Sequence, residues 1–129
     1  MKKLVALALA VIMSMVFINS ASAANTFGSV NVGPWDRGYT QTVDGSGQYG
    51  RITLEGTAGS YADAYVEVYS DGQWRSPTIN DPDLGYLLLN TGVSRDTTNY
   101  FFEKGKKYRL YVSTIGSDYS AKGYIRTYD

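Results

Sequence analysis

The sequence contains no histidine and no cysteine, and these two absences exclude several kinds of catalytic and metal site. A Ser-His-Asp or Cys-His centre needs a base or a nucleophile that the chain lacks. A zinc site built from the usual nitrogen and sulfur ligands is excluded for the same reason. No disulfide can form, so a folded domain must be held together by its hydrophobic core.

Glutamate is also scarce, which limits the carboxylate chemistry that the chain can perform. A glycosidase needs two carboxylates that face a cleft. Glu55 and Glu67 are the pair that strand alternation can place on one outward sheet face. The alternative is that both form ion pairs across strands, with Arg51, Arg109 or Arg126 as the partners. We expect the ion pairs, and therefore a protein that is not an enzyme.

Neither a phosphate-binding loop nor a nucleic-acid surface is indicated. The glycine-rich segments Asp44–Gly47 and Gly56–Gly59 lack the lysine of a phosphate-binding loop, so we expect them to be turns. Basic and acidic residues are equal in number and do not cluster, which gives nucleic acid no attractive surface. We expect no cofactor. A calcium ion remains open as an alternative, because Asp71, Asp81 and Asp83 occupy oxygen-rich loops.

Residues 1–23 have the pattern of a secretory signal peptide. Two lysines follow Met1, an apolar run extends from Leu4 to Ile18, and Ala21–Ala23 supplies a small-residue cleavage site. The apolar run is short for a membrane span of about 20 residues, so we expect cleavage after Ala23 and a secreted, extracellular chain. The remaining segment, Ala24–Asp129, is slightly acidic, and we do not expect it to insert into a membrane. Export without disulfides favours a bacterial source.

After the leader, the sequence predicts strands and no helices. Short runs that alternate between β-branched or aromatic and polar residues are separated by glycine-rich turns, at intervals of about 10 residues. The strictest alternation is in Tyr61–Tyr69, and Ser70–Gln73 follows it with the Asp-Gly turn of a β-hairpin. Further runs are Phe27–Val32, Tyr39–Val43, Gln48–Glu55 and Gly85–Leu89. We therefore predict one all-β domain over residues 24–129, a small antiparallel, jelly-roll-like β-sandwich of about 7–8 strands.

The densest run of strand-forming residues is Tyr100–Val112, which Gly105 interrupts with a turn. Gly116–Asp118 marks a second turn before a last alternating strand, Gly123–Tyr128. We interpret the two strands around Gly116–Asp118 as a C-terminal hairpin. The polar segment Asn90–Asn99, which precedes the run, is predicted to be turn-like.

Residues 102–128 resemble the end of bacterial pre-peptidase C-terminal (PPC-like) domains. The shared pattern is a glycine turn before a tyrosine-rich strand, seen here in Lys104–Val112, and then a polar turn before Gly123–Arg126. Val66–Gly72 resembles the inner hairpin of such domains. The resemblance implies a small jelly-roll-type sandwich of the kind that is attached to secreted enzymes. Because a fold does not imply a function, the resemblance assigns no activity to this chain.

Tyrosine is the most unusual feature of the composition, with 12 tyrosines against 4 phenylalanines. Alternation places several of them opposite the apolar faces of their strands, with arginines among them. Rings with a polar tip suit contact with sugars or peptides, because they provide area at low entropic cost. The alternative is that the tyrosines only form cross-strand ladders with arginine and threonine.

The two tryptophans lie beside predicted turns. We expect Trp35 and Trp74 to pack in the core, and exposed sugar-stacking rings are the alternative. With this alternative included, the candidate ligand-binding residues are Trp35, Tyr65, Tyr69, Trp74, Arg109, Tyr111, Tyr124 and Arg126.

These features favour a secreted, non-catalytic binding module for extracellular carbohydrate, cell wall or a secreted protein partner. The alternative function is an exported effector, either an antimicrobial protein or an inhibitor of a secreted enzyme. We expect an inhibitor to act through one exposed loop, and Arg75–Leu84 is the candidate because it contains two of the three prolines.

Overall fold

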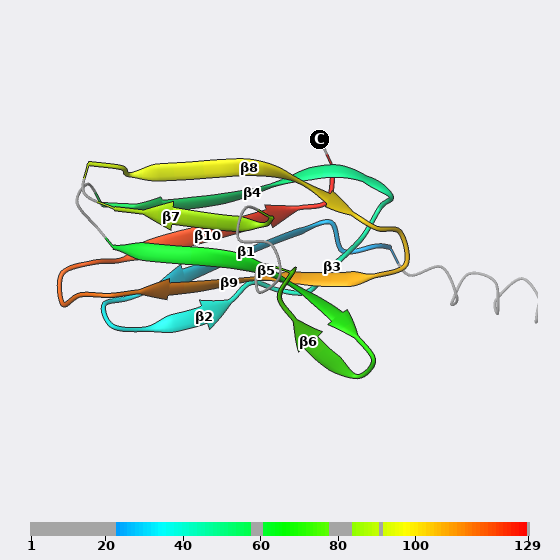
Figure 1. Cartoon of the computed structure of the whole chain (residues 1–129), viewed down its shortest axis with the longest axis horizontal. Coiled ribbons are helices and arrows are strands. Elements are labelled where there is room, and N and C mark those ends of the chain that lie inside the picture. The colour runs from blue at the N-terminus through cyan, green and yellow to red at the C-terminus, as the bar shows by residue number, and fades with distance from the viewer. Residues whose placement is uncertain (1–22, 58–60, 78–83, 91, 129) are drawn as a thin grey trace, which may run out of the picture.

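The chain folds into two antiparallel β-sheets that pack face to face (Figure 1). This computed structural model describes residues 23–57, 61–77, 84–90 and 92–128. Residues 1–22 of the predicted signal peptide lie outside that set. Within the part of the chain that the structure describes, no helix has the length and hydropathy needed to cross a membrane.

Each sheet is built from strands that are distant in the sequence. Sheet A has the order β1-β10-β4-β8, with bounds Phe27–Val32, Ala121–Arg126, Gln48–Gly56 and Arg95–Phe102. Sheet B has the order β2-β9-β5-β6, with bounds Arg37–Tyr39, Lys107–Thr114, Ala62–Ser70 and Gln73–Arg75. Off this path, β3 (Val43–Asp44) pairs with β9 and β7 (Tyr86–Leu89) pairs with β5. Because the chain repeatedly crosses between the sheets, the topology is jelly-roll-like.

The core lies between the sheets and follows directly from the alternation in the sequence. In β5 the buried side is Ala62, Ala64 and Val66, as the pattern over Tyr61–Tyr69 predicted. Its neighbour β9 buries Tyr108, Leu110 and Val112. Sheet A contributes the opposite wall, which includes Val32, Ile52, Leu54, Tyr100, Phe102, Ala121 and Ile125.

The predicted all-β sandwich is confirmed, although the described residues contain ten strands rather than seven or eight. The extra strands are short. The predicted strand Tyr39–Val43 is divided into β2 and β3, because Thr40 interrupts the regular ladder with β9. The Thr40 N–H donates to the Leu110 carbonyl, and the Thr40 Oγ1 accepts the Leu110 N–H, both at 3.0 Å.

The predicted C-terminal hairpin is wrong. β9 and β10 follow each other in the chain but belong to different sheets, so the turn at Gly116–Asp118 connects the two layers. The strands face each other across the core: a Cβ atom on Gly123 would lie 2.5 Å from Val112 Cγ2. The turn-like interpretation of Asn90–Asn99 is also wrong in part, because β8 begins at Arg95. Thr97 holds that strand against β4 by donating from Oγ1 to the Ile52 carbonyl at 2.9 Å.

The β5–β6 hairpin confirms the predicted Asp-Gly turn. Ser70 pairs with Gln73, and the two central residues have positive φ angles, 53° at Asp71 and 77° at Gly72. Positive φ at both positions is the signature of a type I′ turn, whose twist matches that of the strands. The hairpin extends beyond the rest of sheet B (Figure 1) and carries Trp74 on its second strand.

Gly50 marks a point where the fold has no room for a side chain, and this generates a prediction. A Cβ atom there would lie 2.0 Å from the Arg126 carbonyl oxygen and 2.8 Å from the Phe102 ring. Because a backbone atom cannot move aside cheaply, Gly50→Ala should lower the free energy of unfolding by about 2–3 kcal/mol. Gly33→Ala is the matched control, since nothing lies within 4 Å of its Cβ position. Urea denaturation of both variants checks this, and equal stabilities would contradict the described packing.

Candidate functional site

The outer face of sheet B carries a row of four tyrosines, one from each of four adjacent strands. Tyr39 of β2 pairs with Tyr111 of β9, which pairs with Tyr65 of β5, which in turn pairs with Tyr86 of β7. Arg109, Glu67, Tyr69 and Trp74 lie on the same side of the sheet. We call this surface the tyrosine face; its members are Tyr39, Tyr65, Glu67, Tyr69, Trp74, Tyr86, Arg109 and Tyr111.

The rings of this row contact one another across the strands. Tyr65 and Tyr111 are stacked, with ring centroids 4.6 Å apart and planes inclined by 24°. Tyr39 meets Tyr111 edge-on at 5.3 Å. A cross-strand ladder is therefore present, as in the alternative interpretation, but these contacts join tyrosine to tyrosine and not to arginine or threonine.

Two hydroxyl groups of the row, those of Tyr65 and Tyr86, are held in their neutral form. Burial raises the pKa of Tyr65, with further contributions from Tyr111 and from the Glu67 carboxylate. Burial also raises the pKa of Tyr86, and Asp63 adds to the shift through its charge and a hydrogen bond. Because ordinary tyrosines already titrate near pH 10, both hydroxyls stay protonated and can donate hydrogen bonds at neutral pH.

Arg109 is the most constrained side chain of the tyrosine face. Its guanidinium carbon lies 3.8 Å from the centroid of the Tyr39 ring and 4.2 Å from that of Trp74. Its Nε donates to Glu67 Oε1 at 2.6 Å, and both side chains are largely covered, at 21% and 13% exposure. Tyr69 packs edge-on against Trp74 at 5.3 Å. The arginine therefore fixes a ring of β2 and a ring of β6 relative to each other, and Tyr69 of β5 joins them through Trp74.

Trp74 is consequently not a core residue, and the expectation that it packs in the core is wrong. It pairs with Tyr69 in the β5–β6 hairpin, and that position of β5 points outward. The Tyr69 ring is 46% exposed beside it. Trp74 is half-buried, and Tyr69 and Arg109 pack against its ring.

Trp35 contradicts the same expectation more strongly, because 69% of its surface is exposed. It occupies the turn between β1 and β2 with a φ of 51°, a conformation that a bulky residue adopts only when the surroundings impose it. Thr114 of β9 anchors the turn: its Oγ1 donates to the Gly33 carbonyl at 2.6 Å and accepts the Asp36 N–H at 3.2 Å. The backbone of the turn is thus held against the sheet while the indole remains in solvent.

A hollow of about 310 Å³ lies between Trp35 and Tyr111 of the tyrosine row. Its lining combines these two rings with polar groups, namely Trp35, Asp36, Arg37, Tyr111, Ser113 and Thr114. Tyr111 belongs both to the hollow and to the tyrosine face. The hollow therefore extends the tyrosine face to the Trp35 turn, and we call it the Trp35 hollow.

The two other predicted site residues, Tyr124 and Arg126, lie on the opposite side of the molecule. Both are in β10, on the outer face of sheet A, where Tyr124 pairs with Thr53 and Arg126 with Arg51. The structure thus brings together Tyr65, Tyr69, Trp74, Arg109 and Tyr111, with Trp35 at their margin, and separates Tyr124 and Arg126 from them.

Sequence reasoning missed two members of the tyrosine face, Tyr39 and Tyr86. Tyr39 begins the predicted strand Tyr39–Val43, and Tyr86 lies in the predicted strand Gly85–Leu89. Only their pairing with Tyr111 and Tyr65 reveals that they share an outer face.

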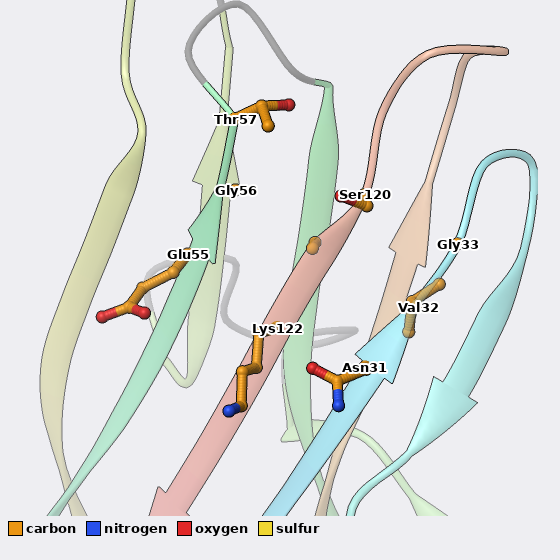
Figure 2. Close-up of a pocket in the computed structure, with 9 residues that line it drawn as sticks. Asn31, Val32, Gly33, Glu55, Gly56, Thr57, Ser120 and Lys122 are labelled. Atoms are coloured by element: carbon orange, nitrogen blue, oxygen red, sulfur yellow. The ribbon is translucent and has the colours of Figure 1, made fainter.

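A second hollow, of about 490 Å³, lies on sheet A where β1, β10 and β4 meet (Figure 2). Lys122 of β10 pairs with Asn31 on one side and Glu55 on the other, so the three polar side chains form a row across the strands. Glu55 pairs with Arg95 at 3.3 Å. Glu55 and Glu67 lie on the outer faces of different sheets, so they do not form a carboxylate pair. Each forms an ion pair across strands, as expected, although the partner of Glu55 is Arg95 and not one of the three predicted arginines.

Metal binding has limited support among the described residues. Within them, no three acidic side chains lie close enough together to hold an ion. Asp71 occupies the exposed β5–β6 turn. Asp81 and Asp83, the other residues of the calcium alternative, lie outside the described residues, as do residues 78–83 of the loop Arg75–Leu84.

Comparisons with known proteins give no family for this chain: no family model matches it, and no curated protein matches it significantly. The expected PPC-like family is therefore not found, although the β-sandwich that it implied is present. Among solved structures, PirA is 9% identical over 81% of this chain and 96% of its own, with a TM-score of 0.49. The Yersinia pseudotuberculosis-derived mitogen is 8% identical over 83% of this chain and 89% of its own, with a TM-score of 0.45. TmCBM61, solved in complex with β-1,4-galactotriose, is 13% identical over 76% of this chain and 70% of its own, with a TM-score of 0.41.

The Arg109–Glu67 pair generates a prediction about the stability of the tyrosine face. Arg109→Met keeps most of the aliphatic stem but leaves the largely covered Glu67 carboxylate without its partner. We expect this variant to lower the free energy of unfolding by about 2 kcal/mol. The double variant Arg109→Met/Glu67→Gln should recover at least half of the loss, because no uncompensated charge remains. Chemical denaturation measures both, and a single variant as stable as the unaltered protein would contradict the described pairing.

Proposed function

We propose that this protein is a secreted, non-catalytic binding module, and that the tyrosine face with the adjoining Trp35 hollow binds extracellular carbohydrate. Export is supported by the signal-peptide pattern of residues 1–23. The ligand is a polysaccharide of a cell wall or of the surroundings, presented to the protein as an extended chain.

The observation that carries the proposal is the exposed indole of Trp35. The positive φ of Trp35 costs stability. Because the residue is 69% exposed, burial of the ring does not offset that cost. The ring borders a hollow lined by carboxylate, guanidinium and hydroxyl groups from Asp36, Arg37 and Ser113. A flat apolar surface next to hydrogen-bonding groups is complementary to a sugar ring, which has apolar faces and a rim of hydroxyls.

The tyrosine face extends this surface across sheet B. Its rings are already fixed by stacking and by the Arg109 guanidinium, so binding would cost little side-chain entropy. The neutral hydroxyl groups of Tyr65 and Tyr86 supply donors and acceptors along the row. An extended glycan lying along the row can thus make several weak, additive contacts with a rigid platform.

A protein partner is the competing occupant, because tyrosine, tryptophan and arginine are also the residues enriched in protein interfaces. The contact with a sugar is favoured by the small size of the Trp35 hollow and by its polar lining. For the effector alternative, an inhibitor would act through the loop Arg75–Leu84, of which residues 78–83 lie outside the described residues.

The test is retention of Ala24–Asp129 on insoluble cell-wall and plant polysaccharides, read by pull-down and tryptophan fluorescence. Trp35→Ala should reduce the affinity at least about tenfold while the free energy of unfolding changes by less than about 0.5 kcal/mol, because the ring is not in the core. Tyr49→Ala is the matched control: Tyr49 is also exposed, at 58%, but lies on the outer face of sheet A.

The control should retain full binding. Equal losses for Trp35→Ala and Tyr49→Ala, or no retention on any polysaccharide, would contradict the proposal. The second result would instead favour the protein partner.

A further inference from the structure

The tyrosine row crosses sheet B from strand to strand, with one tyrosine on each of four neighbouring strands (Figure 1). Tyr39, Tyr111, Tyr65 and Tyr86 are successive register partners on β2, β9, β5 and β7. Neighbouring strands of a sheet lie about 4.8 Å apart. The ring centroids keep nearly that interval, at 5.3 Å between Tyr39 and Tyr111 and 4.6 Å between Tyr111 and Tyr65. The row is therefore a series of groups with a regular spacing.

The stacking of Tyr65 on Tyr111 decides which part of the rings a ligand can reach. Their planes are inclined by only 24°, and the line between their centroids crosses from β5 to β9. Because side chains stand roughly perpendicular to a sheet, the two faces are turned toward each other and the hydroxyl ends point away from the sheet. A ligand above the centre of the row thus meets hydroxyl groups at intervals of about 4.8 Å, one strand spacing.

The charges beside the row are balanced. On one side, Asp63 of β5 is the register partner of Ser113 of β9, which pairs with Arg37 of β2. Ser113 Oγ donates to Asp63 Oδ1. On the other side, Arg109 and Glu67 form an ion pair at 2.6 Å. Among the described residues, each side of the row thus has one carboxylate and one guanidinium group, and this charge pattern is most complementary to a ligand without net charge.

We propose that the row takes a neutral, extended, ribbon-like polysaccharide, a β-1,4-linked glucan, xylan or mannan, with one sugar residue over each strand. This inference rests on the proposed function and names its class of ligand. A sugar residue in such a chain has nearly the length of one strand spacing, and each residue offers hydroxyl groups at the edges of the ribbon. In a coiled chain, such as an α-1,4-linked glucan, successive residues turn away from the line of the tyrosines.

The length of the row limits how many sugar residues it can contact. Tyr39 lies on β2, which pairs with β9, and Tyr86 lies on β7, which pairs with β5, so these two strands are the outermost described strands of the row. Four sugar residues therefore span it. The Trp35 hollow adjoins Tyr111 and Ser113, so the indole lies beside the path of the chain and packs against the sugar residue over β9.

The first experiment measures the affinity of Ala24–Asp129 for oligosaccharides of two to six residues by isothermal titration calorimetry. Cello-, xylo- and manno-oligosaccharides are the extended probes, and malto-oligosaccharides are the coiled probe with the same sugar as the cello-series. We expect at least one extended series to gain at least about tenfold in affinity from two residues to four. From four to six residues the gain should stay below about threefold, because no further tyrosine is reached. Malto-oligosaccharides should bind at least about tenfold more weakly than that series at four residues.

The second experiment removes single hydroxyl groups and keeps the rings. Tyr65→Phe and Tyr111→Phe should each lose about fivefold in affinity for the tetrasaccharide, the effect of one lost hydrogen bond. Tyr69→Phe is the matched control on the same face. Tyr69 follows Tyr65 by four residues in β5, which places it about 13 Å from the row at about 3.3 Å per residue. Its affinity should stay within about twofold of that of the unaltered protein.

Three results would overturn the inference and leave carbohydrate binding itself intact. They are an affinity that stops rising at two residues, maltotetraose that binds as tightly as the best extended tetrasaccharide, and a loss in Tyr69→Phe equal to that in Tyr65→Phe. Retention of the protein on an insoluble polysaccharide without binding of any extended series would also overturn it. The proposed function fails through a different result, which is no retention on any polysaccharide.

Discussion

The antiparallel pairing of β5 with β9 is the constraint on which the rest of the molecule depends. Its register runs from Ala62 opposite Thr114 to Val68 opposite Tyr108. One set of paired positions, such as Val66 with Leu110, enters the core, and the set between them, such as Tyr65 with Tyr111, faces solvent. A slip of one residue would turn the apolar side of the shifted strand towards solvent. The same register therefore builds the core and the centre of the tyrosine face.

The outer faces of the two sheets carry different kinds of side chain. Sheet B turns outward an aromatic row whose single central arginine is neutralised by Glu67 and covered by Tyr39 and Trp74. Sheet A turns outward Tyr124 with Arg51 and Arg126 beside it, and Arg95 of the same face is paired with Glu55.

The sequence was most informative where structure is local. Alternation over Tyr61–Tyr69 predicted which residues of β5 face outward, and the Asp71-Gly72 pair predicted the hairpin that follows. Neither pattern indicates which strands pair with each other in a sheet. The C-terminal hairpin was therefore wrong: β9 and β10 are consecutive but pair with strands distant in the sequence. For the same reason, Tyr124 could not be separated from Tyr111 by alternation alone.

The positions of the tryptophans also depend on long-range contacts. Hydrophobicity favours burial of both rings, but Trp35 is exposed because Thr114, far along the chain, holds the backbone of its turn against β9. Trp74 is placed outside the core by its pairing with Tyr69 and is then covered by Arg109. Each outcome follows from pairings that only the folded chain creates.

The central claim is that the tyrosine face is a binding surface as well as a cross-strand ladder. The most direct test is to map backbone amide chemical shifts of ¹⁵N-labelled Ala24–Asp129 while soluble cell-wall oligosaccharides with no charged groups are added. We predict that the shift changes gather in β9, β5 and the Trp35 turn and leave the amides of β4 and β10 unchanged. Changes confined to sheet A, or no changes at saturating oligosaccharide, would contradict the claim.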